Sequence, residues 1–409
     1  MPRARLSFLF LNLGHFLDHF FMLIFATVAA LRLTGEWGMS YAELIPYATP
    51  GFVAFGVGAI PAGWLADRWS REGMMVIFFI GIGVSSILTA LAGSPLEIAI
   101  GLAAVGLFAA IYHPVGLALV IQGRTKTGVP LAVNGIFGNM GVACAALLTG
   151  YFIDNAGWRS AFVLPGAASI AFGVAYWVFV SWGRAERARA AAAAEAATAK
   201  RAGTGGADAS IDRDTLIRVF AIIAFTTAIG GLIFQSTTFA LPKVFDERLG
   251  DLASSATAIG GYAFAVFTVA AFAQLVVGYF VDHHSVRTVF GFVAALQAAF
   301  FAIMYQLTGV PALVVAVAFM LVVFGQIPIN DVLIGRVTKS AWRSRAFSVR
   351  YIVTFSVSAS TLPLIAWIHG SWGFGTLFVA MAAAAGAIFA AVMLLPRRGA
   401  FIARTPAAA

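Results

Sequence analysis

One short charged phrase occurs twice in this chain, each time between two long apolar runs. The first copy reads Gly63-Trp64-Leu65-Ala66-Asp67-Arg68-Trp69-Ser70-Arg71, and the second reads Gly278-Tyr279-Phe280-Val281-Asp282-His283-His284-Ser285-Val286-Arg287. The two copies are separated by just over half of the 409 residues, and Tyr112-His113-Pro114 is echoed by Gln326-Ile327-Pro328 at nearly the same offset. An internal repeat of this length in so apolar a chain predicts two homologous membrane bundles and points to a transporter.

The apolar content of the chain excludes a soluble fold. Hydrophobic residues make up 61% of it and charged residues 11%, whereas soluble domains carry about 25% charged residues. We therefore expect a lipid bilayer to solvate most of the surface. The net charge of +9 does not indicate nucleic acid as a partner, because the basic residues lie in short loops between apolar runs. The single cysteine, Cys144, excludes a disulfide within the chain.

Charged residues, glycine and proline separate the chain into apolar segments. Each segment is long enough to cross a bilayer as a helix, which needs about 20 residues. The segments before a charged, Ala- and Gly-rich stretch are roughly 6–33, 42–66, 73–92, 96–122, 130–153 and 159–182. Those after it are roughly 215–241, 254–281, 288–307, 311–335, 344–368 and 373–395. We predict an all-α membrane protein of 12 transmembrane helices in two six-helix bundles, residues 1–182 and 215–409, joined by a linker at 183–214.

The distribution of basic residues predicts the orientation. Of the 26 Lys and Arg residues, the loops on the side away from the termini hold only Arg32, Arg159, Lys243 and Arg248. Because cytoplasmic loops carry the excess of Lys and Arg, both termini and the linker are expected in the cytoplasm. We expect a multi-pass, monomeric protein of a bacterial-type inner membrane, with a first spanning helix that is too long for a cleaved signal.

The repeated phrase, the two predicted bundles and the central linker together resemble the major facilitator superfamily. The loop signature of that family, G-x-L-a-D-r-x-G-r-[KR], is matched at Gly63, Leu65, Asp67, Arg68 and Arg71. Ser70 stands where the family has glycine, and the second copy keeps Gly278, Asp282 and Arg287. The resemblance implies a small-molecule transporter whose two halves rock about a central site, with these loop charges as a latch. The alternative is a solvated loop whose charges only set the topology.

A second resemblance is narrower. Four short motifs together are similar to the fosmidomycin-resistance-type branch of exporters. They are His15-x-x-Asp18, His113-Pro114, the run 138–143 and Gly157-Trp158-Arg159. That resemblance implies efflux of a drug or metabolite. The antiporter signature of the superfamily has a Gly-Pro pair in the fifth helix, where this chain has Ala145-Ala146 and no proline. Antiport, symport and uniport therefore stay open.

The first apolar segment contains three titratable residues, His15, Asp18 and His19. Spacings of three and four place them near one face of a helix, and ionisable groups at membrane depth usually face a cavity or a partner. We predict that they carry protons that drive transport. The alternatives are that Asp18 only hydrogen-bonds a neighbouring helix, or that His15 and His19 share a metal ion with Asp18. Because no other Cys or His lies close in sequence, no metal and no cofactor is predicted.

The candidate substrate contacts lie on other segments. His113 precedes a mid-span proline, which frees a backbone carbonyl and breaks a helix. The predicted contacts are His113, Tyr112, Gln235, Gln326 and Arg350. Arg350 either pairs with Asp331, as a structural or gating pair, or attracts an anion in the cavity.

Three functions compete on the sequence. The first is a proton-driven secondary transporter of a small organic molecule. The second is an uncoupled uniporter, or a sensor or assembly protein that keeps the fold without transport. An enzyme or ATP-driven pump is not expected, because the chain has no Ser/His/Asp spacing, HExxH motif or Walker loop.

Overall fold

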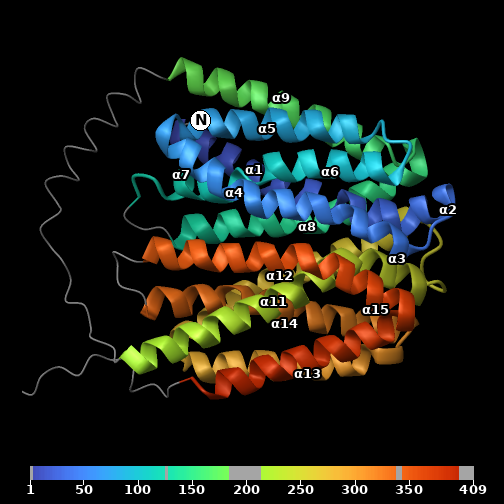
Figure 1. The fold of residues 1–409 in the computed structure, drawn as a ribbon, viewed down its shortest axis with the longest axis vertical. Helices are drawn as coiled ribbons and strands as arrows, with labels where there is room; N and C mark the ends of the chain where they lie inside the picture. The colour runs from blue at the N-terminus through green and yellow to red at the C-terminus, as the bar shows by residue number, and fades with distance from the viewer. Residues whose placement is uncertain (1–2, 125–127, 184–212, 338–342, 396–409) are drawn as a thin grey trace, which may run out of the picture.

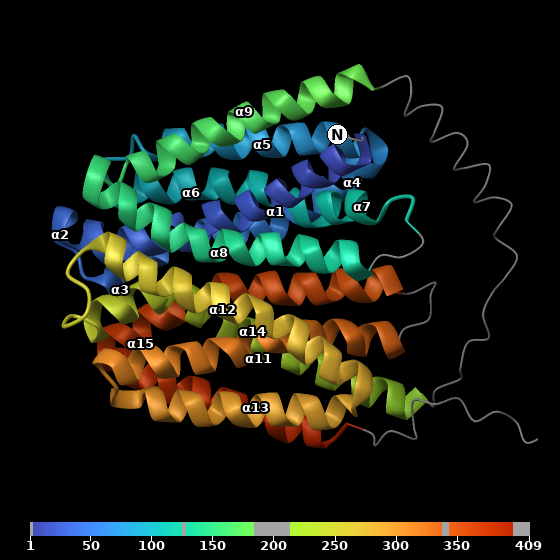
Figure 2. The ribbon, with the colours of Figure 1, turned by 180° about the vertical axis from the view of Figure 1, so that it is seen from behind.

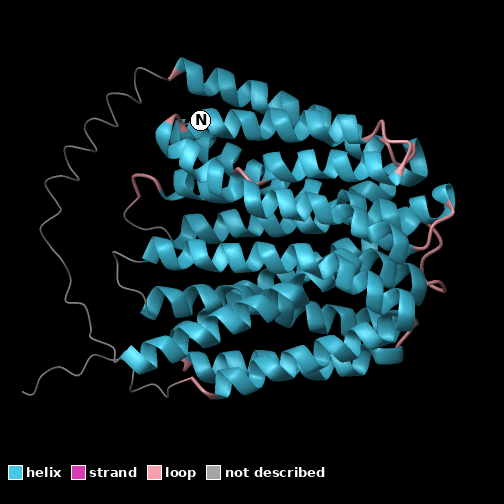
Figure 3. Cartoon of the chain, viewed as in Figure 1, coloured by secondary structure: helices cyan, strands magenta, loops and turns pink. Residues whose placement is uncertain are grey.

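The computed structural model describes residues 3–124, 128–183, 213–337 and 343–395. Within these ranges the chain is helical throughout, apart from short loops, and has no strand (Figure 3). The long helices run along one common direction (Figure 1). The predicted linker lies almost wholly outside the described residues.

The first half consists of helices that correspond to the first predicted segments. They are α1 (Arg3–Val28) with its continuations η1 (Ala29–Leu33) and α2 (Thr34–Trp37); α3 (Tyr41–Leu44), η2 (Ile45–Ala48) and α4 (Thr49–Arg68); α5 (Arg71–Thr89); α6 (Pro95–Ala109), η3 (Tyr112–Gly116) and α7 (Leu117–Ile121); α8 (Gly128–Ala156); and α9 (Ser160–Trp182).

The second half follows the same order. Its elements are α11 (Arg213–Arg248), α12 (Ala256–His283), α13 (Val286–Ile303), η4 (Met304–Gln306), α14 (Gly309–Val337) and α15 (Arg343–Met393). The structure has 11 helices long and apolar enough to cross a membrane among the described residues. The last of them, α15, contains the non-helical Gly373 (φ 74°), which divides it into two helices at the predicted boundary. The predicted all-α membrane fold of two bundles is confirmed.

The repeated phrase begins a helix in both halves. Ser70 Oγ accepts a hydrogen bond from Gly73 N (3.0 Å) at the start of α5. At the equivalent place in the second copy, Ser285 Oγ accepts one from Thr288 N (3.4 Å) at the start of α13. Serine thus satisfies one of the unpaired amides of each helix start, which explains why it replaces the signature glycine.

This cap has a measurable consequence. Ser70→Ala is expected to lower the free energy of unfolding by about 1 kcal/mol, because an amide loses its partner. Ser70→Gly, which restores the signature residue, is expected to cost only a few tenths of a kcal/mol. Thermal unfolding of the two variants in the same detergent tests this, and a Ser70→Ala variant as stable as wild type would show that the cap contributes nothing.

The end of α9 and the start of α11 lie at one end of the bundle, here called the linker end, and the opposite end is called the far end (Figures 1 and 2). Asp154 of α8 accepts hydrogen bonds from the amides of Thr257 (2.7 Å) and Ala256 (3.3 Å) at the start of α12. Across the same end, the Tyr41 ring lies 5.4 Å from the His369 ring of α15. Among the described residues, these contacts close the far end.

Candidate functional site

The fourth predicted helix is broken where the sequence places Pro114. Helix α6 ends at Ala109, and residues 112–116 form the π-helical turn η3 before α7 continues. Proline cannot donate to the preceding turn, and single π-helical turns are frequent at functional sites. Gly63 packs against this break, because a Cβ there would lie 3.3 Å from Pro114 Cβ. The break sets the direction of the His113 side chain.

The break brings His113 to Asp18 of α1. His113 Nε2 lies 3.3 Å from Asp18 Oδ2. The Asp18 side chain is fully buried, whereas that of His113 is 14% exposed. A carboxylate removed from water needs a partner, and among the described residues His113 is the titratable group within ion-pair distance of Asp18.

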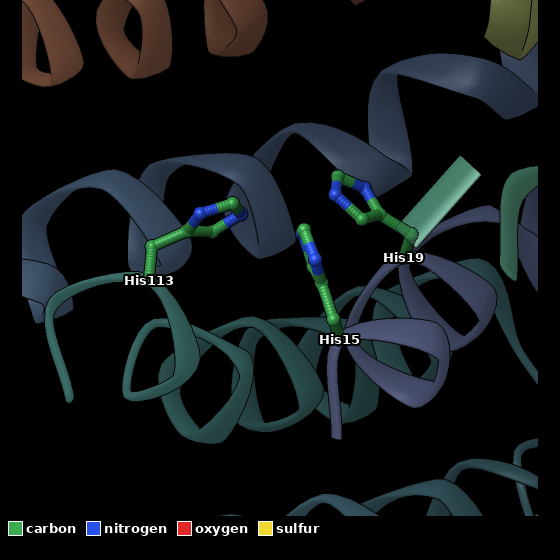
Figure 4. A group of neighbouring side chains, drawn as sticks. All are labelled: His15, His19 and His113. Atoms are coloured by element: carbon green, nitrogen blue, oxygen red, sulfur yellow. The ribbon is translucent and has the colours of Figure 1, made fainter. Parts of the chain in front are cut away.

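Two further histidines, His15 and His19, lie near His113 (Figure 4). The His15 ring lies 5.0 Å from the His19 ring and 5.4 Å from the His113 ring, measured between centroids. The His19 and His113 rings are 5.6 Å apart. His15 is buried, while His19 and His113 are each partly exposed. Helix α1 and the turn η3 thus gather three imidazoles and one carboxylate, the histidine cluster.

Next to the cluster, a buried polar network joins α1, η3 and α8. The Tyr112 hydroxyl donates to the carbonyl of Leu11 (2.8 Å). Asn134 Nδ2 of α8 donates to that hydroxyl (2.8 Å) and to Asn12 Oδ1 (2.9 Å). Tyr112 and Asn134 are both fully buried. Tyr112, a predicted substrate contact, is therefore part of this network and holds α1 against η3.

The arrangement is suited to holding and passing a proton. Imidazole titrates near neutral pH and can take or give a proton at either nitrogen. In an otherwise apolar bundle, a carboxylate and three neighbouring imidazoles form a group that can bind and release a proton inside the membrane-spanning part of the protein.

The same rings raise the question of a metal ion. The nitrogens that His15, His19 and His113 offer lie within 4.8 Å of one another. Zinc binds histidine nitrogen at about 2.0–2.1 Å, so nitrogens that share a tetrahedral ion lie about 3.4 Å apart. The three rings would have to close in, and Asp18 is not part of the group. We therefore assign no ion to the cluster.

The second half contributes neutral amides. Gln326 Oε1 on α14 accepts from Gln297 Nε2 of α13 (2.8 Å). Gln235 on α11 is 5% exposed, and its Nε2 has no hydrogen-bond partner among the described residues. The side chains of Asp331 and Arg350 lie outside the described part of the chain, so their predicted pairing stays a prediction.

The predicted latch residues form local contacts at the linker end. Arg71 Nη2 lies 2.6 Å from Asp67 Oδ1, in an exposed pair that links the end of α4 to the start of α5. The Arg68 guanidinium lies 5.5 Å from the centre of the Trp64 ring. In the second copy, Arg287 Nη1 donates to the carbonyl of Leu395 (3.2 Å), and Asp282 is exposed. A latch between the halves stays a prediction.

Sequence reasoning missed part of this site. It placed His113 on a separate helix as a substrate contact and did not pair it with Asp18. It passed over Asn12 and Gln297. One signal was readable: Asn12, His15 and His19 share one helical face.

Comparison with known families decides the class of protein. Residues 11–251 match the family model of the Major Facilitator Superfamily. The chain belongs to this superfamily. It is therefore a multi-pass membrane protein of a transporter family rather than of an enzyme family. The narrower resemblance to fosmidomycin-resistance-type exporters stays a prediction.

Curated relatives each match about a third of the chain. A gallate transporter of Pseudomonas putida is 28% identical over 144 residues, which is 35% of this chain and 32% of the relative. A 4-hydroxybenzoate transporter of Pseudomonas aeruginosa is 26% identical over 147 residues, 36% of this chain and 33% of the relative. A tetracenomycin C resistance and export protein of Streptomyces glaucescens is 29% identical over 147 residues, 35% of this chain and 27% of the relative. The match thus spans about a third of the length of these relatives.

Solved structures share the whole fold. A D-xylose–proton symporter superposes with a TM-score of 0.73 at 12% identity, over 96% of this chain and 98% of that one. A xylose transporter from E. coli in an inward-open conformation gives a TM-score of 0.73 at 13% identity, over 96% of each chain. At this identity the likeness concerns the fold alone.

Proposed function

We propose that this protein is a proton-coupled secondary transporter of small organic acids, with aromatic carboxylates as the first candidates. The observation that carries the proposal is the 3.3 Å approach of His113 Nε2 to the buried Asp18 Oδ2. The pair of Asp18 and His113 can bind one proton, and the charge of the pair changes when it does so.

The proposed mechanism is alternating access, in which the two halves rock about a site near the membrane midplane. In one state the pair of Asp18 and His113 exchanges a proton with one side of the membrane. After the halves rock, the same pair faces the other side, and the charge on the cluster biases which state is populated. His19 extends this exchange toward the partly exposed face of the cluster, and His15 extends it toward the buried face.

The substrate class is supported by the relatives. Two of them are described as transporters of gallate and of 4-hydroxybenzoate, both aromatic carboxylates. A protonated histidine cluster attracts an anion, and His113, Gln235, Gln326 and Arg350 are proposed to orient it. We also propose that the linker end is cytoplasmic in a bacterial-type inner membrane and that the protein acts as a monomer.

Reconstitution in liposomes tests this function. With an acid exterior and neutral interior, labelled 4-hydroxybenzoate or gallate should accumulate against its gradient, and a protonophore should abolish the accumulation. A pH dye inside the liposomes should report proton entry when substrate is added. Flux that follows only the substrate gradient would identify a uniporter and overturn the coupling.

Two controls sharpen the result. A chelator such as EDTA should leave uptake unchanged, since no metal ion takes part. Tetracenomycin C, the substrate of the export relative by name, should not compete with the acids. Proton-driven transport of that compound, together with no acid uptake, would replace an organic-acid carrier with a drug exporter.

A further inference from the structure

The His15 ring is held in place on several sides. Its Nδ1 lies 2.8 Å from the carbonyl oxygen of Asn134, and the Tyr112 ring stacks on it at 4.8 Å with 16° between the planes. The bare backbone of Gly138 fits against it so closely that a Cβ there would lie 2.7 Å from two ring atoms. Real Cβ atoms do not approach so near, so only glycine leaves room for this ring.

The stacked Tyr112 ring is fixed by the same means. Besides its hydroxyl bonds to Leu11 and Asn134, the ring is enclosed by two glycines. A Cβ at Gly14 would lie 2.9 Å from it, and one at Gly116 would lie 2.6 Å from it. Glycines on α1, η3 and α8 therefore make the space for one stacked pair of rings.

The bond to Asn134 also determines the tautomer of His15. A carbonyl oxygen only accepts hydrogen bonds, so Nδ1 must carry the hydrogen. In the neutral ring the lone pair then lies on Nε2, which is buried and has no hydrogen-bond partner among the described residues. His15 can therefore accept one proton, at one known atom.

We propose that His15 is the fixed proton acceptor of the cluster and that Asn134, Gly138 and Tyr112 are its positioning residues. The proposal rests on the proton coupling proposed above. A proton enters through the partly exposed His19 or His113, passes to His15 Nε2, and gives an imidazolium that still donates from Nδ1 to Asn134. It leaves by the reverse path, so no other bond changes.

The groups that face His15 are few. The titratable ones are His19 on its own helix and His113 and Tyr112 on η3, with Asp18 beside His113. From α8 the described contacts are the carbonyl of Asn134 and the backbone of Gly138. The charge state of His15 therefore depends on the cluster and on the geometry that α8 imposes.

A matched pair of alanine variants on α8 tests the proposal. Gly138→Ala places a methyl group where the His15 ring lies, so the ring must turn away from Asn134 and Tyr112. Gly135→Ala, one turn earlier, meets nothing within 4 Å. The first readout is ¹⁵N NMR of histidine-labelled protein, with the His15 signal assigned by its loss in His15→Gln. The second readout is the pH midpoint of proton-coupled 4-hydroxybenzoate uptake.

The wild type and Gly135→Ala should show the Nδ1–H tautomer and the same pH midpoint. Gly138→Ala should lose that tautomer signal and shift the midpoint by about one pH unit, the usual scale of a changed environment for histidine. An unchanged signal and midpoint in Gly138→Ala would overturn the proposal.

A second pair covers the case in which Gly138→Ala does not fold. Tyr112→Phe keeps the stacking ring and should keep the His15 tautomer, whereas Tyr112→Leu removes the ring and should mix the tautomers. The two readouts also separate the proposals. A wild type with the Nδ1–H signal but no proton-coupled uptake disproves the proposed function, and coupled uptake without that signal disproves the positioning of His15.

Discussion

Asp18→Asn is expected to reduce uptake driven by a pH gradient to the level of protein-free liposomes. Asparagine has nearly the same shape as aspartate, so it fits the fully buried position beside His113, but it cannot bind and release a proton. Exchange of labelled for unlabelled substrate at equal pH should persist, because exchange needs no net proton movement. Uptake and exchange measured on the same liposomes provide the test.

The physical basis is the location of the charge. A buried carboxylate is stabilised only by its partner, so its removal should leave the folded yield unchanged or raise the thermal midpoint. Asp251→Asn, which alters an exposed carboxylate in a loop at the far end, is the matched control and should behave as wild type. Gradient-driven uptake that survives in Asp18→Asn would leave His113 without its proposed role.

The fold could be predicted because its signals are local. Apolar segments of spanning length and the repeated charged phrase are properties of neighbouring residues, and both survive in the structure. The break at Pro114 was also readable, since proline removes a donor wherever it stands. Pro328, its counterpart in the repeat, lies within the helix α14, so proline alone did not determine where a helix is broken.

The site was only partly predictable because its key distances are not local. His15, Asp18 and His19 share a helix, and their spacing placed them together. The approach of His113 depends on how closely η3 packs against α1 and α4, at glycines whose neighbours no single sequence reveals. Asn134 looks the same in sequence whether its amide only joins helices or its backbone carbonyl also positions a histidine.

The interface of the two halves shows the same dependence on glycine. A Cβ at Gly260 of α12 would lie 2.3 Å from the carbonyl oxygen of Ala146 on α8, and one at Gly150 would lie 2.2 Å from that of Ala256. Small residues let helix backbones approach closely in membranes. Helices α8 and α12 thus hold the far end closed by backbone contact, aided by Asp154.

Gly260→Ala is therefore expected to destabilise the closed far end by about 1–3 kcal/mol, the usual effect of overpacking. A cysteine pair at Ala42 and Gly370, in a background with Cys144 replaced, reports closure, because a Cβ at Gly370 would lie 2.9 Å from that of Ala42. Cross-linking should fall in Gly260→Ala and stay at the wild-type level in Gly261→Ala, whose Cβ meets nothing within 4 Å. Equal cross-linking in both would mean that contacts other than α8 with α12 hold the far end closed. A loss in Gly260→Ala alone would mean that this backbone contact opposes the opening that transport requires.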